Sequence, residues 1–483
     1  MHCFALLILP EWLGELVHLQ VLHLDGEWSE VISNRSLRKL PEALGSLHCL
    51  KSLTLKNSES LRTLPASIVT LTSLETLYIK DCWGFKELPT MGAMPALRSL
   101  TLCDSLQNLP ACLGEFELRY LMLGYFRHVT NLPGICERLT VLETLHIEGC
   151  ATLHQLQTMR LMTSLTSLTF HKCSITHLPA MRAMKNLTSI IITNCVDLIE
   201  LPCVGQIPNL LNLSLVNLGS LLRLPVSIGK LTSLRNLKLD TCNMISDLPS
   251  MCEMWSLEAV YISNCVALKE LPARVDALTG LHTLELVDLE NLDTQPFPIF
   301  ELTGLTELTL TNCGLKDVSV SIESLTNLRS LTISVPAAGL STLACALPAL
   351  RLLQGLQINE LDEDDVITIG RSLKAWPMPL VVLYPFSIGQ FVSIGQICCE
   401  ALGLPAKAAR WDNMVVLQHW RVQQHKMMAF VSGLHVRLGA ASPISSLTDF
   451  AIVFITNEVL GGWTLRNLWQ QERLAREALL LSM

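Results

Sequence analysis

The chain has 483 residues, of which half are hydrophobic and only 16% are charged, and its formal net charge at pH 7 is −8. This negative balance, with no stripe of lysine and arginine, argues against a nucleic-acid-binding surface. No G-x-S-x-G, H-E-x-x-H or G-x-x-x-x-G-K-[ST] motif and no protein kinase motif set occurs, so we expect no enzyme activity, no catalytic residues, no cofactor and no metal site.

A leucine frame, L-x-x-L-x-L-x-x-C, recurs about every 23 residues from the N-terminus to about residue 360. Strict copies start at Leu74, Leu142, Leu165, Leu187, Leu234, Leu257 and Leu305, and looser copies at Leu19, Leu50, Leu97, Leu118, Leu210, Leu281, Leu328 and Leu353. This spacing is typical of leucine-rich repeats, strand-and-turn units that bury their leucines only by stacking. We therefore expect an α/β solenoid over residues 1–360, with about fifteen repeats and a curved parallel sheet on its concave face.

The chain opens inside the first repeat, because Leu9-Pro10 precedes Leu19 by the same distance as Leu64-Pro65 precedes Leu74. The apolar run 4–9 therefore belongs to a repeat, and we do not expect it to be a signal peptide. No polar cap precedes this first repeat, and a longer natural protein is therefore one alternative. The Leu-Pro pairs recur before most strands, where proline suits an irregular return path along the convex side.

The segments LPASIVTLTSLETLYIKDC (64–82) and LPVSIGKLTSLRNLKLDTC (224–242) resemble repeats of plant intracellular nucleotide-binding resistance receptors, and also the Ras-group leucine-rich-repeat proteins. The resemblance covers roughly residues 9–360 and implies a recognition module with an immune or signalling role. The phosphate-binding loop of those receptors is absent, so their nucleotide-driven switch is not implied here. The L-x-G-x-I-P turn of plant extracellular repeats is also absent, which favours the cytoplasmic branch.

Cysteine occupies the last position of the frame in seven copies, namely Cys82, Cys150, Cys173, Cys195, Cys242, Cys265 and Cys313. We interpret these thiols as buried structural side chains that face inward against backbone groups. The alternative is a metal or redox ladder through Cys150, Cys173 and Cys195, but no C-x-x-C pair or histidine spacing accompanies it. Unpaired thiols in this number fit a reducing compartment, so we expect a cytoplasmic location.

The positions two, four, six and seven residues after the first leucine of each copy should face solvent on the concave side. Four of the five tyrosines occupy such positions, and tyrosine is enriched at binding hot spots. The candidate partner-binding residues are Lys56, Tyr78, Lys80, Arg98, Tyr120, Met122, Tyr125, His146, Glu148, His171, Lys238, Asp240, Tyr261 and Glu285. The alternative is that these aromatic residues merely suit strands.

Two groups form when the predicted strands are laid side by side. Lys56 and Lys80 share an offset beside Tyr78 and Arg98, and further on His146, Glu148 and His171 follow Tyr120 and Met122. Glu148 and His171 should be directly opposed, within about 5 Å, as a pH-sensitive contact, a metal pair or an exposed polar network. The second group comprises Lys238, Asp240, Tyr261 and Glu285.

We predict that residues 361–404 form a transition and capping segment. Its acidic run 362–365 suits a solvated boundary, and 375–399 carries no charge and is long enough to span a bilayer. Prolines and glutamines in that stretch favour a strand followed by a buried cap, so membrane contact through 378–399 is the weaker alternative.

Residues 405–483 read as a helical C-terminal region, with apolar spacing over 410–438, around 446–460 and after Gly461-Gly462. It would cap the last repeat or form a small partner-binding domain. The segment PISSLTDF (443–450) resembles the opening of an F-box helix, although the glutamate-rich continuation is missing. That resemblance implies an alternative role as a ubiquitin-ligase substrate adaptor, with the C-terminal helices binding the effector.

These observations predict a non-enzymatic recognition module that binds a protein ligand or effector, and not nucleic acid, on its concave face.

Overall fold

The computed structural model of the chain describes residues 8–25, 37–361, 380–385 and 454–455, with gaps inside 37–361 at 87, 90, 93, 104–108, 110, 127–129, 131, 133–137, 154–155, 157–158, 160, 273, 293–297, 315–317, 319 and 336. The chain divides into two compact units, one of residues 1–281 with 291–293 and one of residues 282–290 with 294–483.

Strands β1 to β15 occur where the leucine frame predicts them, each beginning two residues after the first leucine of a copy. The first unit holds β1 (Val21–Asp25), β2 (Ser52–Lys56), β3 (Thr76–Lys80), β4 (Ser99–Cys103), β5 (Tyr120–Gly124), β6 (Thr144–Glu148), β7 (Ser167–His171), β8 (Ser189–Thr193), β9 (Asn212–Val216), β10 (Asn236–Asp240) and β11 (Ala259–Ser263). The second unit holds β12 (Thr283–Val287), β13 (Glu307–Thr311), β14 (Ser330–Ser334), β15 (Gly355–Leu361), β16 (Leu380–Pro385) and β17 (Phe454–Ile455).

Consecutive strands pair in parallel from β1 to β11 and again from β12 to β17. Among the repeats the register aligns equal positions of the frame, so a residue six positions after the first leucine, here called position +6, lies beside +6 of the next repeat. Leucines at +3 and +5 point into a core that is almost fully buried, such as Leu77 and Ile79 at 0% and 1% exposure.

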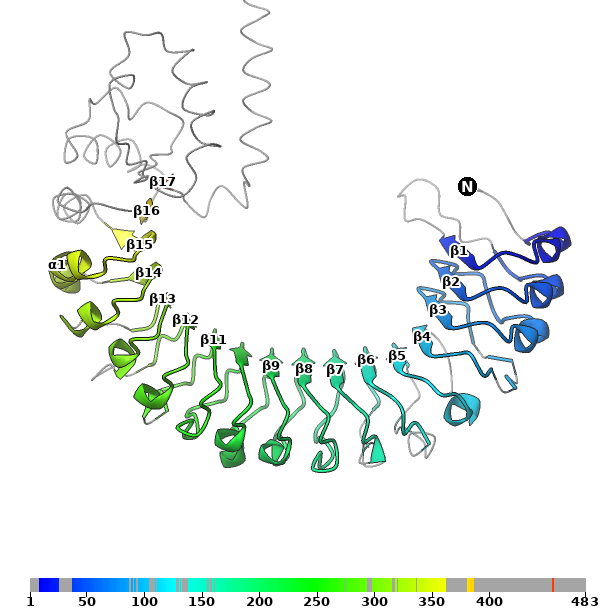
Figure 1. Ribbon diagram of the computed structural model, residues 1–483, viewed down its shortest axis with the longest axis horizontal. Helices are drawn as coiled ribbons and strands as arrows, with labels where there is room; N and C mark the ends of the chain where they lie inside the picture. The colour runs from blue at the N-terminus through cyan, green and yellow to red at the C-terminus, as the bar shows by residue number, and fades with distance from the viewer. Residues whose placement is uncertain are drawn as a thin grey trace, which may run out of the picture. The chain divides into compact units, whose positions relative to one another are not determined.

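The return paths contain short helical turns, and in each unit these lie on the opposite side from the strands (Figure 1). They are η1 (Glu11–Glu15), η2 (Glu42–Ser46), η3 (Ala66–Thr70), η4 (Ala111–Glu115), η7 (Val204–Gln206), η8 (Val226–Lys230), η9 (Val275–Ala277), η10 (Pro298–Glu301), η11 (Val320–Ser324) and η12 (Leu347–Ala349), with the helix α1 (Ala337–Ala346). The Leu-Pro prolines lie on the return path, as predicted, and the structure shows that they precede such turns. Pro65 and Pro225 come directly before η3 and η8 with φ near −65°, where a missing N–H costs nothing.

Each strand is followed at position +7 by a residue that often has a positive φ. These residues are Asn57, Asp81, Tyr125, Gly149, Lys172, Asn194, Asn217, Thr241, Asn264, Asp288 and Asn312. The left-handed backbone lets the N–H continue the ladder to the next strand, as when Asn217 donates to the carbonyl of Asp240 at 2.7 Å. Asparagine and aspartate tolerate this conformation better than most side chains, which explains their frequency at +7.

The predicted C-terminal regions fall mostly outside the described residues. The strand expected within 375–399 is present as β16, whereas Phe454–Ile455 form a strand inside the stretch 446–460 that the apolar spacing predicted as helical. The other residues of the capping segment and of 405–483 are not among those described. No helix in the described ranges combines the length and apolar character that crossing a bilayer requires.

Candidate functional site

The concave face changes character at β4 and β5. On most strands of the first unit the core positions are buried and the concave positions are partly exposed. On β4 and β5 the later concave positions are buried as well, and only Ser99 and Tyr120 at the start of each strand stay partly exposed. Thr101 and Cys103 are only 2% exposed and Met122 only 8%, although all three lie on the concave side. Side chains from neighbouring strands must therefore cover this part of the face.

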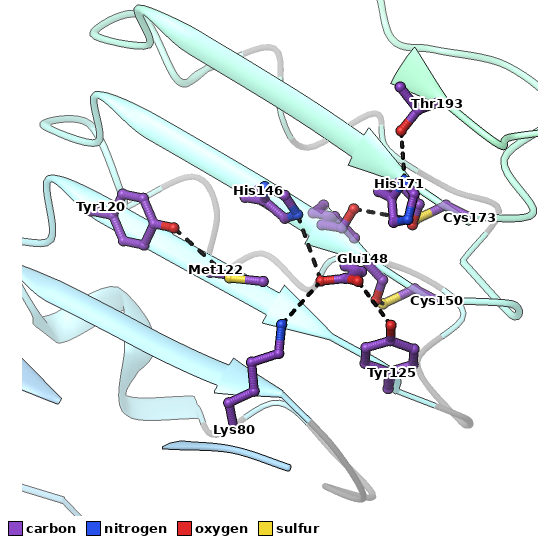
Figure 2. Close-up of polar contacts among 11 residues, drawn as sticks. Lys80, Tyr120, Met122, Tyr125, His146, Glu148, Cys150, His171, Cys173 and Thr193 are labelled. Carbon is purple, nitrogen blue, oxygen red and sulfur yellow. Dashed lines mark hydrogen bonds and ion pairs between the residues drawn. The ribbon is translucent and has the colours of Figure 1, made fainter. Parts of the chain in front are cut away.

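Lys80 of β3 provides part of that cover, because its ammonium reaches the carboxylate of Glu148 on β6, with Nζ 3.7 Å from Oε2 (Figure 2). The same position holds Cys103 on β4 and Gly124 on β5, so only small groups lie beneath the lysine stem. A Cβ on Gly124 would lie 2.8 Å from Sγ of Cys103. Burial lowers the pKa of Lys80, but Glu148 and, to a smaller extent, Cys103, Tyr78 and Asp81 together outweigh it and raise the pKa above its ordinary value.

Glu148 is the centre of this arrangement, with a side chain only 14% exposed. The hydroxyl of Tyr125 donates a hydrogen bond to Oε1 at 2.8 Å. Oε2 faces Nζ of Lys80 at 3.7 Å and Nε2 of His146 at 3.9 Å, and both distances exceed hydrogen-bond length. One carboxylate oxygen is therefore fixed, while the other is held only by longer-range attraction.

Tyr125 reaches Glu148 from an unusual backbone position. It follows β5 with a φ of +59°, and Gly149, at the same position after β6, has a φ of +63°. A Cβ on Gly149 would lie 2.5 Å from Cδ1 of the Tyr125 ring, so the ring packs directly over the glycine. The glycine leaves space for the ring, and the position of the ring places its hydroxyl within hydrogen-bond distance of Glu148.

The two histidines have different partners. Nε2 of His146 is buried and makes no hydrogen bond within the described part of the chain. Burial lowers the pKa of His146 below its ordinary value of 6.5, and the attraction of Glu148 only partly opposes this, so the ring is neutral at pH 7. His171 lies directly opposite Glu148 in the register, as predicted, but its Nδ1 contacts Oγ1 of Thr193 at 2.6 Å.

Aromatic and thioether groups form the other wall. Tyr78 and Tyr120 are half-buried, and burial raises the pKa of each phenol above its ordinary value, so both stay neutral. The hydroxyl of Tyr120 lies 3.8 Å from Sδ of Met122, and Met122 lies beside His146 in the register. We call this set the concave cluster: Tyr78, Lys80, Tyr120, Met122, Tyr125, His146, Glu148 and His171.

Two candidate residues lie apart from the concave cluster. Lys56 shares the row of Lys80, as predicted, but pairs with Asp25 of the adjacent strand at 3.8 Å. Arg98 precedes β4, donates to the carbonyl of Pro95 at 2.8 Å and pairs with Glu117 at 3.2 Å. Neither contacts Glu148.

The second predicted group is partly assembled in the first unit. Lys238 of β10 lies beside Tyr261 of β11. Asp240 accepts hydrogen bonds from Asn264 at 3.0 Å and Thr241 at 2.9 Å. Burial raises the pKa of Asp240, but the hydrogen bonds from Asn264, Thr241 and Ser263 and the charge of Lys238 together outweigh it and lower the pKa below its ordinary value. Glu285 lies on β12 of the other unit.

Sequence reasoning missed the Lys80–Glu148 ion pair, because it compared only adjacent strands. It also missed Gly124 and Gly149, the two glycines that make the arrangement fit. A signal was present: at +6 and +7 the frame otherwise has mostly polar side chains, and two glycines in consecutive repeats mark a place where another group approaches closely.

The frame cysteines donate to backbone carbonyls, as the structural interpretation predicted. Sγ of Cys313 lies 3.0 Å from the carbonyl oxygen of Leu286, and Sγ of Cys173 lies 3.5 Å from that of Ile147. Donation to Cys173 and burial both raise the pKa of Cys150. No group of three or more His, Cys, Asp or Glu side chains among the described residues is arranged to hold a metal ion.

No family model matches the chain. Among solved structures, the Toll–Spätzle complex of Drosophila aligns with a TM-score of 0.52 and 18% identity, covering 73% of this chain and 52% of that chain. The functional domain of InlJ from Listeria monocytogenes, which includes a cysteine ladder, gives 0.48 and 17%, covering 77% and 75%. A leucine-rich-repeat protein of Leptospira interrogans gives 0.46 and 23%, covering 73% and 87%. Strands β1 to β15, which lie at the copies of the leucine frame and pair in parallel within each unit, confirm the predicted leucine-rich-repeat fold.

Proposed function

We propose that this leucine-rich-repeat chain is a non-enzymatic recognition module that binds a protein partner on its concave face, centred on the concave cluster. The observation that carries the proposal is the convergence of side chains from β3, β5, β6 and β7 over one patch of sheet (Figure 2). Elsewhere in the first unit the concave positions are mostly short polar side chains, such as those of Ser189 and Ser214.

The mechanism is binding by a preformed surface. Parallel strands hold Tyr78 and Tyr120 on a rigid sheet, and the rings are already half-buried, so little ordering entropy is lost on association. Tyrosine combines a large apolar ring with a polar hydroxyl, which suits the centre of an interface. The Lys238–Tyr261 pair would extend the contact toward β11.

A pull-down from the native cells, read by mass spectrometry, tests this proposal. The bait is the full chain, compared with a Tyr78→Ala, Tyr120→Ala variant and with Trp255→Ala as the control. Trp255 is an aromatic residue that is 63% exposed and lies outside the strands. The captured amount of each partner should fall at least about tenfold with the tyrosine variant and stay unchanged with Trp255→Ala. Partners retained by that variant, with wild-type circular dichroism, would place recognition elsewhere.

The wider setting that we propose is cytoplasmic signalling of an immune kind, supported by the resemblance of residues 64–82 and 224–242 and by the free thiols of the described cysteines. The adaptor alternative would use 405–483 for the effector, and the structure describes only Phe454–Ile455 of that stretch. Deleting 405–483 separates the two: an adaptor keeps its concave-face partner and loses the effector.

A further inference from the structure

We infer that Glu148 receives a cationic side chain, arginine or lysine, from the protein partner, and that Lys80 occupies this place in the free protein as an internal substitute. This inference rests on the proposed function and adds to it the chemistry of the group recognised. It follows from the reach of Lys80, from two polar atoms beside it that make no hydrogen bond to the described residues, and from the apolar groups around it.

The reach of Lys80 is the first observation. Charged residues in one row of a parallel sheet normally pair with the next strand, as Lys56 does with Asp25. Lys80 instead crosses two intervening strands, and the row is cleared for it by the small residues Cys103 and Gly124. Extending a four-carbon side chain this far restricts its rotamers, which opposes the attraction it gains. The net attraction between Lys80 and Glu148 is therefore reduced by the cost of this restriction.

The second observation is the unmet hydrogen-bonding capacity next to it. Oε2 of Glu148 and Nε2 of His146 face each other at 3.9 Å, and neither has a hydrogen bond among the described residues. The ammonium of Lys80 lies 3.7 Å from Oε2, beyond hydrogen-bond length, and makes no hydrogen bond to Nε2 of His146. A guanidinium carries five N–H donors in a planar fork and could bond to the carboxylate and the imidazole together.

The third observation is the surroundings of the carboxylate. Tyr125 holds Oε1 by its hydroxyl and presents a ring that is 37% exposed, while Met122 and Tyr120 form an apolar side. Aromatic faces attract cations, and the apolar side accepts the aliphatic stem of lysine or arginine. An acidic partner group would have to draw Lys80 away and leave Glu148 half-buried without a counter-charge, which is unfavourable. The site therefore favours a cation over a carboxylate.

The test uses the full chain with 13C-labelled methionine methyl groups and the peptide Gly-Gly-Arg-Gly-Gly as probe. Matched peptides carry lysine, neutral citrulline or glutamate in place of arginine. The signal of Met122, assigned with Met122→Leu, should shift and saturate with arginine and lysine and stay unchanged with citrulline and glutamate. No shift with arginine up to about 20 mM would overturn the inference, because that range reaches even millimolar affinity.

Two variants sharpen the result. Lys80→Met keeps the stem over Cys103 and removes the competing charge, so the arginine peptide should bind about five- to tenfold more tightly. Glu148→Gln should weaken it at least about tenfold. Lys56→Met, in the same row but paired with Asp25, is the control and should change neither value. Thermal melting confirms that each variant is folded.

Weaker binding of the arginine peptide by Lys80→Met, or a shift produced by the glutamate peptide, would contradict the inference. The cellular pull-down keeps this separate from the proposed function. If Tyr78→Ala, Tyr120→Ala loses the partner while Lys80→Met also weakens its capture, the concave face is confirmed as the binding surface and the cationic group is refuted. If the tyrosine variant keeps its partners, the proposed function itself fails.

Discussion

The ring of Tyr125 packs over Gly149 so closely that an added Cβ would lie 2.5 Å from Cδ1 and 2.6 Å from Cε1. This contact joins two neighbouring repeats at the position where both backbones are left-handed. It also fixes the hydroxyl that donates to Glu148. A residue without a side chain therefore determines how the acidic group of the concave cluster is held.

Gly149→Ala should destabilise the fold by about 1–3 kcal/mol, because alanine is strained at a φ of +63° and its methyl group would displace the Tyr125 ring. Urea unfolding followed by circular dichroism measures the change. Gly219→Ala is the control, since a Cβ there meets nothing within 4 Å, and it should be neutral or slightly stabilising. Equal effects of the two substitutions would refute the contact.

Stability should fall as the pH drops from about 6.5 through the lower pKa of His146. The unfolded chain takes up a proton near the ordinary value, whereas burial keeps the folded ring neutral until a lower pH. His171, Lys80, Glu148 and Cys173 are the titratable groups that act on it. Urea unfolding at pH 7.5 and pH 5.5 should show a smaller loss for His146→Gln than for the wild type.

The control for that experiment is His177→Gln, whose histidine is 59% exposed. It should keep the pH dependence of the wild type. A His146→Gln variant with the same loss as the wild type would show that the decline at acid pH comes from other groups.

Asn217 should resist β-branched substitution. Its φ is +52°, its N–H donates to Asp240, and its Nδ2 donates to Oδ1 of Asn194 at 2.7 Å. Asn217→Val should cost about 1–2 kcal/mol, since a branched Cβ clashes in the left-handed region. Asn217→Gly relieves the backbone and loses only the side-chain bond, so it should cost less. Thermal unfolding of both variants tests the order, and a harmless valine would contradict it.

The leucine frame predicts every strand of the repeats because alternation along a strand is a local property: residues two apart share a face, as Leu77 and Ile79 do. It predicts rows such as Lys56 beside Lys80 for the same reason. It does not predict the ion pair between Lys80 and Glu148. That pair depends on the reach of the lysine side chain over two strands and on the small size of Cys103 and Gly124 beneath it.

Burial of Thr101 and Cys103 is likewise a product of the neighbours and not of their own repeat. The pattern places both on the concave face, where an isolated strand would leave them in solvent. Only the rotamers of long side chains on flanking strands decide whether such positions are covered, and periodicity carries no information about rotamers. Residues 405–483 lack the frame altogether, so their prediction rested on apolar spacing alone.

The structural role of the frame cysteines can be tested at Cys313 in the second unit. Its Sγ lies 3.0 Å from the carbonyl oxygen of Leu286 and 3.2 Å from that of Thr311, and burial raises its pKa to about 12. The thiol is therefore a neutral donor at physiological pH. It should resist disulfide reagents at pH 8 in the folded protein, because the thiolate is the reactive form.

Cys313→Ala should cost about 1–2 kcal/mol, because it removes the donor to two carbonyl groups and leaves a small cavity. Cys313→Ser retains a donor in nearly the same volume and should recover part of that loss. Cys345→Ala is the control, because that thiol is exposed on α1. Urea unfolding gives the order: serine more stable than alanine points to the hydrogen bonds, whereas alanine more stable than serine would show that the slot needs apolar volume and not a donor.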